Sequence, residues 1–329
     1  MSKQRKLSYL FSILWVAILF AAIMGAVATG VINSYYSGIL VLIGINIILA
    51  VSLNLVTGFL GQLVLGHAGF MSVGAYSAAL FTMHAGLPIS VAFPLGLIFG
   101  GLVAAIFGVI IGVPALRLRG DYLAIITLGF GEIIRVLVLA VDFTGGAAGL
   151  TGIPYIEGKY TLIIYTFFIA FLTVVAILAF IRSRHGRAVI AIREDEIAAE
   201  ASGINTTYYK LLAFVVAAFF AGVAGGIYAH YIGVLDPSKF DFNYSVEILI
   251  MVVLGGMGSI TGSVCSATVL TLLPEMLRSF ADKRMLIYSL VLIIVMLFKP
   301  TGLLGTREFS VRKIVGKLFK EKKKDTGTP

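Results

Sequence analysis

The sequence predicts an all-α polytopic membrane protein with about eight to ten transmembrane elements, including glycine-broken or re-entrant segments, arranged as two structural repeats. Hydrophobic residues make up 59% of the 329 residues and charged residues only 12%. The mean hydropathy is +1.03, and soluble domains do not combine such values. Apolar runs of about 20 residues, long enough to cross a bilayer as a helix, recur along the chain. We expect residues 1–306 to form a single transmembrane domain and residues 307–329 a basic cytoplasmic tail.

The first apolar run, residues 7–28, follows a basic start and ends in Ala26-Val27-Ala28, which resembles a signal-peptide cleavage site. Its 22 residues exceed the ~7 to 15 residues of a signal peptide's apolar region. We therefore expect an uncleaved first span, with the N-terminus in the cytoplasm because basic residues stay on that side.

Six further spans are expected from apolar runs, at residues 37–56, 63–83, 89–113, 122–141, 162–181 and 211–232. In this alternation Arg117 and Arg119 fall on the cytoplasmic side, as do Arg182, Arg184 and Arg187. The predicted topology is therefore consistent with the distribution of basic residues.

The C-terminal part is expected to contain an odd number of crossings, because Lys210 and the basic tail both belong in the cytoplasm. Two apolar stretches remain there, residues 246–273 and 286–298. The first is interrupted by four glycines and predicts either a re-entrant pair of half-helices or two short traversals. These glycines are Gly255, Gly256, Gly258 and Gly262.

A second glycine-interrupted segment lies near the start of the chain and contains Gly58, Gly61, Gly66 and Gly69. One such segment in each half is typical of a transport pathway at the interface of structural repeats. The alternative is close packing of membrane helices through small residues.

Few ionisable residues lie within the expected spans. Glu132 and Arg135 are three positions apart on one helix face and are expected to pair, in a structural role or on the pathway. Gln62, His67 and Glu247 are further candidates to face a solute path, although a lone polar residue in a membrane helix also commonly bonds a neighbouring helix.

The residues from 182 to 210 form a polar segment between two apolar spans. They include nine Asp, Glu, Lys and Arg residues, while residues 188–201 are strong helix formers with apolar positions at helical spacing. Gly203 is expected to end this helix. Such a helix has the shape needed to dock into a groove on a partner. The alternative is a solvated helical loop.

Other functional classes lack support. The net charge of +9 arises from the termini and the central segment, so it reflects membrane topology rather than a nucleic-acid partner. The single cysteine, Cys265, excludes a disulfide framework and a Cys/His metal cluster. No phosphate-binding loop, H-E-x-x-H or G-x-S-x-G motif occurs, so we expect no catalytic, cofactor-binding or metal-binding residues. A translocating chain without an ATPase site needs a separate energy source.

Six runs in order resemble the inner-membrane permeases of branched-chain amino-acid ABC transporters, of the LivM type. The first is LNLVTGFLGQLVLGHAGFMSVGAY, and together they occupy residues 53–76, 117–135, 144–154, 186–205, 210–229 and 246–263. The resemblance covers most of residues 40–304. It implies a bacterial inner-membrane importer for leucine, isoleucine or valine that works by alternating access.

The resemblance also implies partners. These are two cytoplasmic ATPases that bind ATP and Mg²⁺, a second permease, and a periplasmic binding protein that delivers the amino acid. The central helix resembles the coupling helix, or EAA loop, of ABC importers, with Ala198, Ala199 and Gly203 at its Ala-Ala and Gly positions. Ile197 takes the usual Glu position and Glu196 precedes it. Residues expected to couple to the ATPase are Arg193, Glu194, Asp195, Glu196, Ala198, Ala199 and Gly203.

Three alternatives remain open from the sequence. A permease for another small solute, such as urea, a sugar or a short amide, fits the same fold. A passive channel needs no ATPase, and the docking helix argues against it. A membrane-embedded enzyme would rest only on Glu132 and His67, without any catalytic motif.

Overall fold

The computed structural model describes residues 34–118, 120–156, 160–277, 284–299, 302, 303 and 305. The expected first span, the basic tail and the predicted positions of both termini lie outside these residues. The described part consists of helices joined by loops and contains no strand, although Leu150 and Leu235 form an isolated bridge. Residues Gly38–Thr306 form one compact unit. The predicted all-α class is therefore confirmed.

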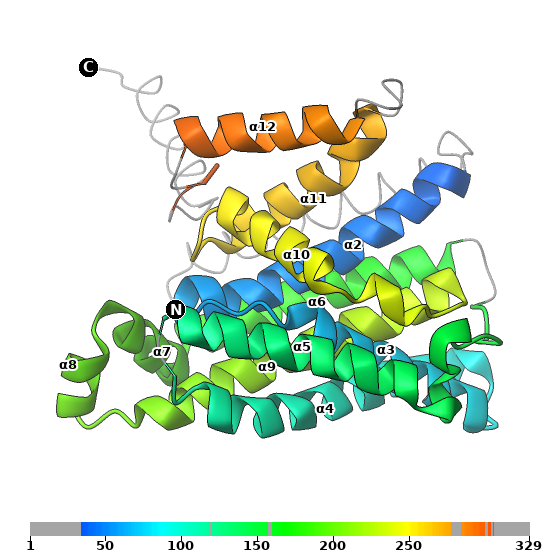
Figure 1. Ribbon diagram of the computed structural model, residues 1–329, viewed down its shortest axis with the longest axis horizontal. Coiled ribbons are helices and arrows are strands. Elements are labelled where there is room, and N and C mark those ends of the chain that lie inside the picture. Colours follow the sequence, from blue (N-terminus) through cyan, green and yellow to red (C-terminus); the bar gives the residue numbers. More distant parts are fainter. Residues whose placement is uncertain are drawn as a thin grey trace, which may run out of the picture. The chain divides into compact units, whose positions relative to one another are not determined.

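The long helices run alongside one another, and two short helices lie together beyond one end of them (Figure 1). Five of the helices, described below, are long and apolar enough to cross a membrane. In chain order the α-helices are α2 (Ser34–Asn54), α3 (His67–His84), α4 (Ile89–Ala115), α5 (Asp121–Ala140), α6 (Thr161–Arg182), α7 (Arg184–Glu194), α8 (Glu196–Ala201), α9 (Thr206–Ile232), α10 (Phe242–Gly255), α11 (Ile260–Met276) and α12 (Arg284–Phe298).

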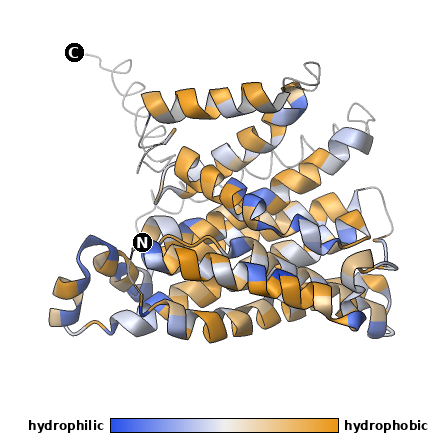
Figure 2. Ribbon diagram, viewed as in Figure 1, coloured by the Kyte–Doolittle hydropathy of each residue, from blue (hydrophilic) through white to orange (hydrophobic). Residues whose placement is uncertain are grey.

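The five helices that could span a membrane are α2 together with the π-helical turn Leu55–Phe59, and α4, α5, α6 and α9. Figure 2 shows hydrophobic residues along these helices and hydrophilic residues on α7 and α8. The chain is therefore an integral membrane protein. The count of eight to ten elements and the two repeats stay predictions, because α10, α11 and α12 have 14, 17 and 15 residues. A bilayer-crossing helix needs about 20.

The helices divide into an inner and an outer set. The most apolar stretch is 89% buried in α2 and 67% buried in α9, but only 28% buried in α5 and in α6. On α4, the apolar residues Ile98, Leu102, Ile106 and Ile110 are exposed at every fourth position. Such a stripe on one helix face suits contact with lipid.

Glycine lets α3 and α9 approach closely. A methyl group on Gly74 of α3 would collide with the backbone of Gly222 of α9, and one on Gly225 would collide with the carbonyl oxygen of Met71. Membrane helices use small residues in this way, since lipid gives them no hydrophobic drive to associate.

Both glycine-rich segments interrupt helices as predicted. In the first, the π-helical turn Leu55–Phe59 is followed by non-helical residues before α3 begins at His67. In the second, α10 ends at Gly255 and α11 begins at Ile260. Two glycines were wrongly expected to interrupt helices, because Gly69 lies inside α3 against Gly131 and Gly262 lies inside α11 against Gly255.

Replacing Gly225 by alanine is expected to destabilise the protein by about 1–3 kcal/mol, the usual cost of overpacking a filled interior. The added methyl group would meet backbone atoms of α3, which cannot rotate away as a side chain can. Thermal unfolding in detergent measures the loss. The matched control is Gly129→Ala in α5, where a methyl group would have no atom within 4 Å. Equal unfolding temperatures for the two variants would contradict the tight α3–α9 interface.

Candidate functional site

The central polar segment forms two short helices, so the prediction of one helix over residues 188–201 was wrong. The chain is extended at Asp195 between α7 and α8, and the Asp195 carboxylate accepts hydrogen bonds from the backbone N–H groups of Ile197 and Ala198. Aspartate is a favoured N-cap residue because its carboxylate accepts hydrogen bonds from the free N–H groups of the first helical turn. Ser183 caps α7 similarly, through the N–H groups of His185 and Gly186.

Gly203 ends α8, as predicted. Its φ is +82°, which places it in the left-handed region that favours glycine. The N–H of Gly203 donates to the carbonyl of Glu200, and the N–H of Ile204 donates to that of Ala199. This pair of hydrogen bonds is a Schellman motif. It fixes the direction in which the chain leaves α8 for α9.

The exposed residues of α8 include an aliphatic side chain as well as the carboxylate of Glu200. The Ile197 side chain is 71% exposed, and Ala198 is exposed beside it, whereas Ala199 is buried. Gly203 has no atom within 4 Å of the place where a side chain would stand. The loop therefore presents one large aliphatic side chain among exposed alanines and carboxylates, of which Glu194 and Glu200 are examples.

Glu196 faces inward. Its carboxylate lies 2.7 Å from the ammonium of Lys210 in α9, with 20% of the Glu196 side chain exposed and only 3% of Lys210. Glu194 points outward instead, with 71% of its side chain exposed and a 3.8 Å separation from Arg193. The two acidic residues therefore differ, since Glu196 anchors α8 to the start of α9.

The two broken segments meet at Asn54, the last residue of α2. The fully buried Asn54 amide nitrogen donates to the carbonyl of Ser259 and to the Ser263 hydroxyl, both at 2.9 Å. Its oxygen accepts the backbone N–H of Gly258 at 2.9 Å. One side chain thus replaces the hydrogen bonds that the break between α10 and α11 removes.

Arg193, at the end of α7, reaches the same junction. Its Nη1 donates to the carbonyl of Gly58 at 2.9 Å, within the π-helical turn. A side chain on Gly258 would stand 3.0 Å from the same Nη1. The guanidinium therefore contacts the broken segment of each half.

Glu132 and Arg135 form the predicted ion pair midway along α5, at 2.7 Å, and each side chain is about one third exposed (32% and 28%). Glu132 also lines a crevice with Gly69, Asp241 and Ser245, where α3, α5 and the start of α10 meet. The crevice has no room for a water molecule in this conformation. Glu247, farther along α10, is exposed.

The other two candidate pathway residues lie elsewhere. His67 is buried at the start of α3, and its Nε2 is 3.0 Å from the Ser52 hydroxyl. Gln62 is half-buried in the non-helical stretch before α3. The contact with Ser52 is of the interhelical kind that the sequence analysis gave as the alternative to a role on the solute path. His67 also lies outside the crevice beside Glu132.

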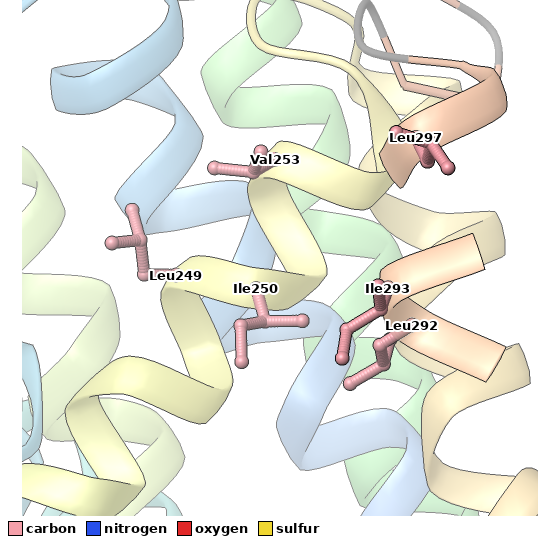
Figure 3. Close-up of a pocket in the computed structure, with 6 residues that line it drawn as sticks. All are labelled: Leu249, Ile250, Val253, Leu292, Ile293 and Leu297. Carbon is pink, nitrogen blue, oxygen red and sulfur yellow. The ribbon is translucent and has the colours of Figure 1, made fainter. Parts of the chain in front are cut away.

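An apolar groove of about 430 Å³ lies between α10 and α12. Figure 3 shows Ile250 of α10 and Ile293 of α12 on opposite walls. All six lining side chains are aliphatic, namely Leu249, Ile250, Val253, Leu292, Ile293 and Leu297. The groove therefore offers no polar side chain to hold a charged or hydrogen-bonding group.

Within the described ranges, no three or more His, Cys, Asp or Glu side chains gather closely enough to hold a metal ion. Cys265 is exposed there and forms no disulfide.

Two residues at these sites were not identified from the sequence as site residues. Asn54 bonds to residues more than 200 positions away, so no local pattern marks it. In the sequence, Lys210 was taken to indicate only the cytoplasmic side of the membrane. A lysine just inside an apolar span, however, also indicates a buried partner, which here is Glu196.

The known proteins that resemble this chain in sequence are transport permeases. The family model described as "Branched-chain amino acid transport system / permease component" matches residues 35–299. The "High-affinity branched-chain amino acid transport system permease protein LivM" of Salmonella typhimurium is 39% identical over 291 residues, covering 79% of this chain and 68% of that protein.

A second relative is the "High-affinity branched-chain amino acid transport system permease protein LivH" of Escherichia coli K12. It is 35% identical over 143 residues, covering 43% of this chain and 46% of that protein. Among solved structures, a chain of "PsaBC from Streptococcus pneumoniae in complex with Fab" matches with a TM-score of 0.46 and 15% identity, covering 84% of this chain and 95% of that chain. That similarity is too low to support an argument.

Removing the Glu196 carboxylate by a Glu196→Ala substitution is expected to destabilise the protein by about 2–3 kcal/mol, somewhat less than a fully buried ion pair would cost. The reason is that Lys210 would remain buried without its partner. Chemical or thermal unfolding in detergent measures the change.

The matched control for this change is Glu194→Ala, which removes an exposed carboxylate and should cost less than about 0.5 kcal/mol. A double variant, Glu196→Ala with Lys210→Met, is expected to recover most of the loss. If Glu196→Ala and Glu194→Ala are equally stable, the ion pair does not anchor α8.

Proposed function

Because the chain belongs to the family of branched-chain amino acid transport system permease components, we propose that it is the permease subunit of an ATP-binding-cassette importer that moves leucine, isoleucine and valine across a bacterial inner membrane. The observation that carries this proposal is the 39% identity to a LivM permease over 79% of the chain. As a member of this family the chain is a transport subunit, and ATP and Mg²⁺ would bind to separate ATPase chains.

A second, related permease is the proposed membrane partner. This chain is similar to two differently named permeases of one transport system in Escherichia coli K12, LivM and LivH. The exposure of Glu247 on the mostly apolar helix α10 supports such a partner, because a carboxylate among apolar residues is normally covered by protein or water rather than by lipid. A hetero-dimer would provide that cover.

The loop of α7 and α8 is the proposed docking surface for an ATPase. Its hydrophilic helices lie together beyond one end of the long helices (Figures 1 and 2). On them, the exposed Ile197 and Ala198 offer an apolar anchor, and interfaces of this kind derive most of their energy from a few such anchors. Glu196 would contribute by holding α8 in place rather than by touching the ATPase.

The proposed substrate path runs past the ion pair of Glu132 and Arg135. A branched-chain amino acid is a zwitterion with an aliphatic side chain, so adjacent opposite charges in apolar surroundings suit it. The crevice beside Glu132 is closed, as one state of an alternating-access cycle would be. Glu247, Gln62 and His67 remain candidates for the same path, and a periplasmic binding protein would deliver the amino acid.

Replacing Ile197 by aspartate is expected to reduce ATP-dependent leucine uptake about tenfold or more, equivalent to losing ~1.4 kcal/mol of docking free energy. The side chain is 71% exposed, so the permease itself should fold as before. The measurement is radiolabelled leucine uptake into proteoliposomes that contain both permeases, the ATPases and the binding protein.

The matched control, Ile197→Met, keeps an apolar side chain and should transport like the wild type. Excess unlabelled isoleucine or valine should compete with leucine, while urea or a sugar should not. Uptake that continues without the ATPases would identify a channel. Unchanged uptake in the aspartate variant would remove α8 as the docking surface.

A further inference from the structure

We propose that Arg193 is the positioning residue that transmits movement of the α7–α8 loop to both broken membrane segments, with Asn54 joining those segments to each other. This inference rests on the proposed function, and it adds a defined connection between the docking surface and the membrane interior. It is carried by hydrogen bonds that link three parts of the chain far apart in sequence.

Arg193 is rooted in the docking loop. It lies in the last turn of α7, two residues before the extended residue Asp195. Its side chain crosses to the membrane segment and donates to the carbonyl of Gly58 at 2.9 Å. Carbonyls at a helix end lack an intrahelical partner and carry partial negative charge, so a guanidinium is well suited to them.

The second half of the connection is steric. The Arg193 guanidinium lies so close to Gly258 that a side chain there would stand 3.0 Å from Nη1. Along the aliphatic stem of the same residue, a side chain on Gly61 would stand 3.0 Å from the Arg193 Cγ. Arg193 therefore packs against two glycines, one from each broken segment, where a larger residue would collide with it.

Asn54 makes the two segments respond together. Its side chain holds the backbone N–H of Gly258 and the carbonyl of Ser259 at 2.9 Å each, and it lies four residues before Gly58, where Arg193 bonds. Breaks in helices are where backbone angles change most easily. A displacement of α7 would thus reach a hinge in each half through one arginine.

The test compares Arg193→Met with Arg187→Met in the full complex of both permeases, the ATPases and the binding protein. Both changes remove one positive charge from α7, and Arg187 is exposed. Methionine keeps the packed stem of Arg193 but cannot donate to Gly58. ATP hydrolysis and leucine uptake are measured in the same proteoliposomes, and the readout is leucine transported per ATP hydrolysed.

Arg193→Met is expected to lower this ratio about fivefold or more while ATP hydrolysis stays within about twofold of wild type, a typical span for coupling between sites. Arg187→Met should leave the ratio unchanged. Arg193→Lys, which restores one donor, should recover part of the loss. If the methionine variant does not assemble, Arg193→Gln takes its place, because its amide is too short to reach Gly58.

An unchanged ratio in the Arg193 variant would overturn the inference. A parallel fall in hydrolysis and uptake would overturn it too, because it would assign Arg193 to ATPase docking. Wild-type complex that shows no ATP-dependent leucine uptake would instead defeat the proposed function, so the two failures are distinguishable.

Discussion

The structure depends on satisfying backbone polar groups where a helix is interrupted inside an apolar protein. A backbone polar group that is buried and left unpaired costs several kcal/mol. Asn54 meets this requirement for the break between α10 and α11 by bonding to Gly258, Ser259 and Ser263. A buried amide from another helix therefore helps to stabilise the irregular backbone between α10 and α11.

The helices around the interruptions differ in how they pack. The close contact of α3 and α9 through Gly74, Gly222 and Gly225 gives a rigid interior, while α4, α5 and α6 turn apolar faces outward. Tight packing beside interrupted helices favours movement at the interruptions. In the proposed coupling, the α7–α8 loop would act on these few hinges rather than on the whole bundle.

Features set by neighbouring residues could be predicted from the sequence. The pairing of Glu132 with Arg135 follows from a three-residue separation on a helix, and the end of α8 follows from Gly203. The split between α7 and α8 was missed because helix propensity through residues 188–201 concealed the capping strength of Asp195. Contacts such as Asn54 with Gly258 depend on three-dimensional packing, which no short pattern records.

The inward ion pair of Glu196 and Lys210 has an evolutionary consequence. Neither charge can be lost alone without leaving the other buried, whereas exchanging both for apolar residues is tolerable. Among related chains the two positions should therefore vary as a pair. A lineage that changed one of the two positions first would pass through a destabilised intermediate.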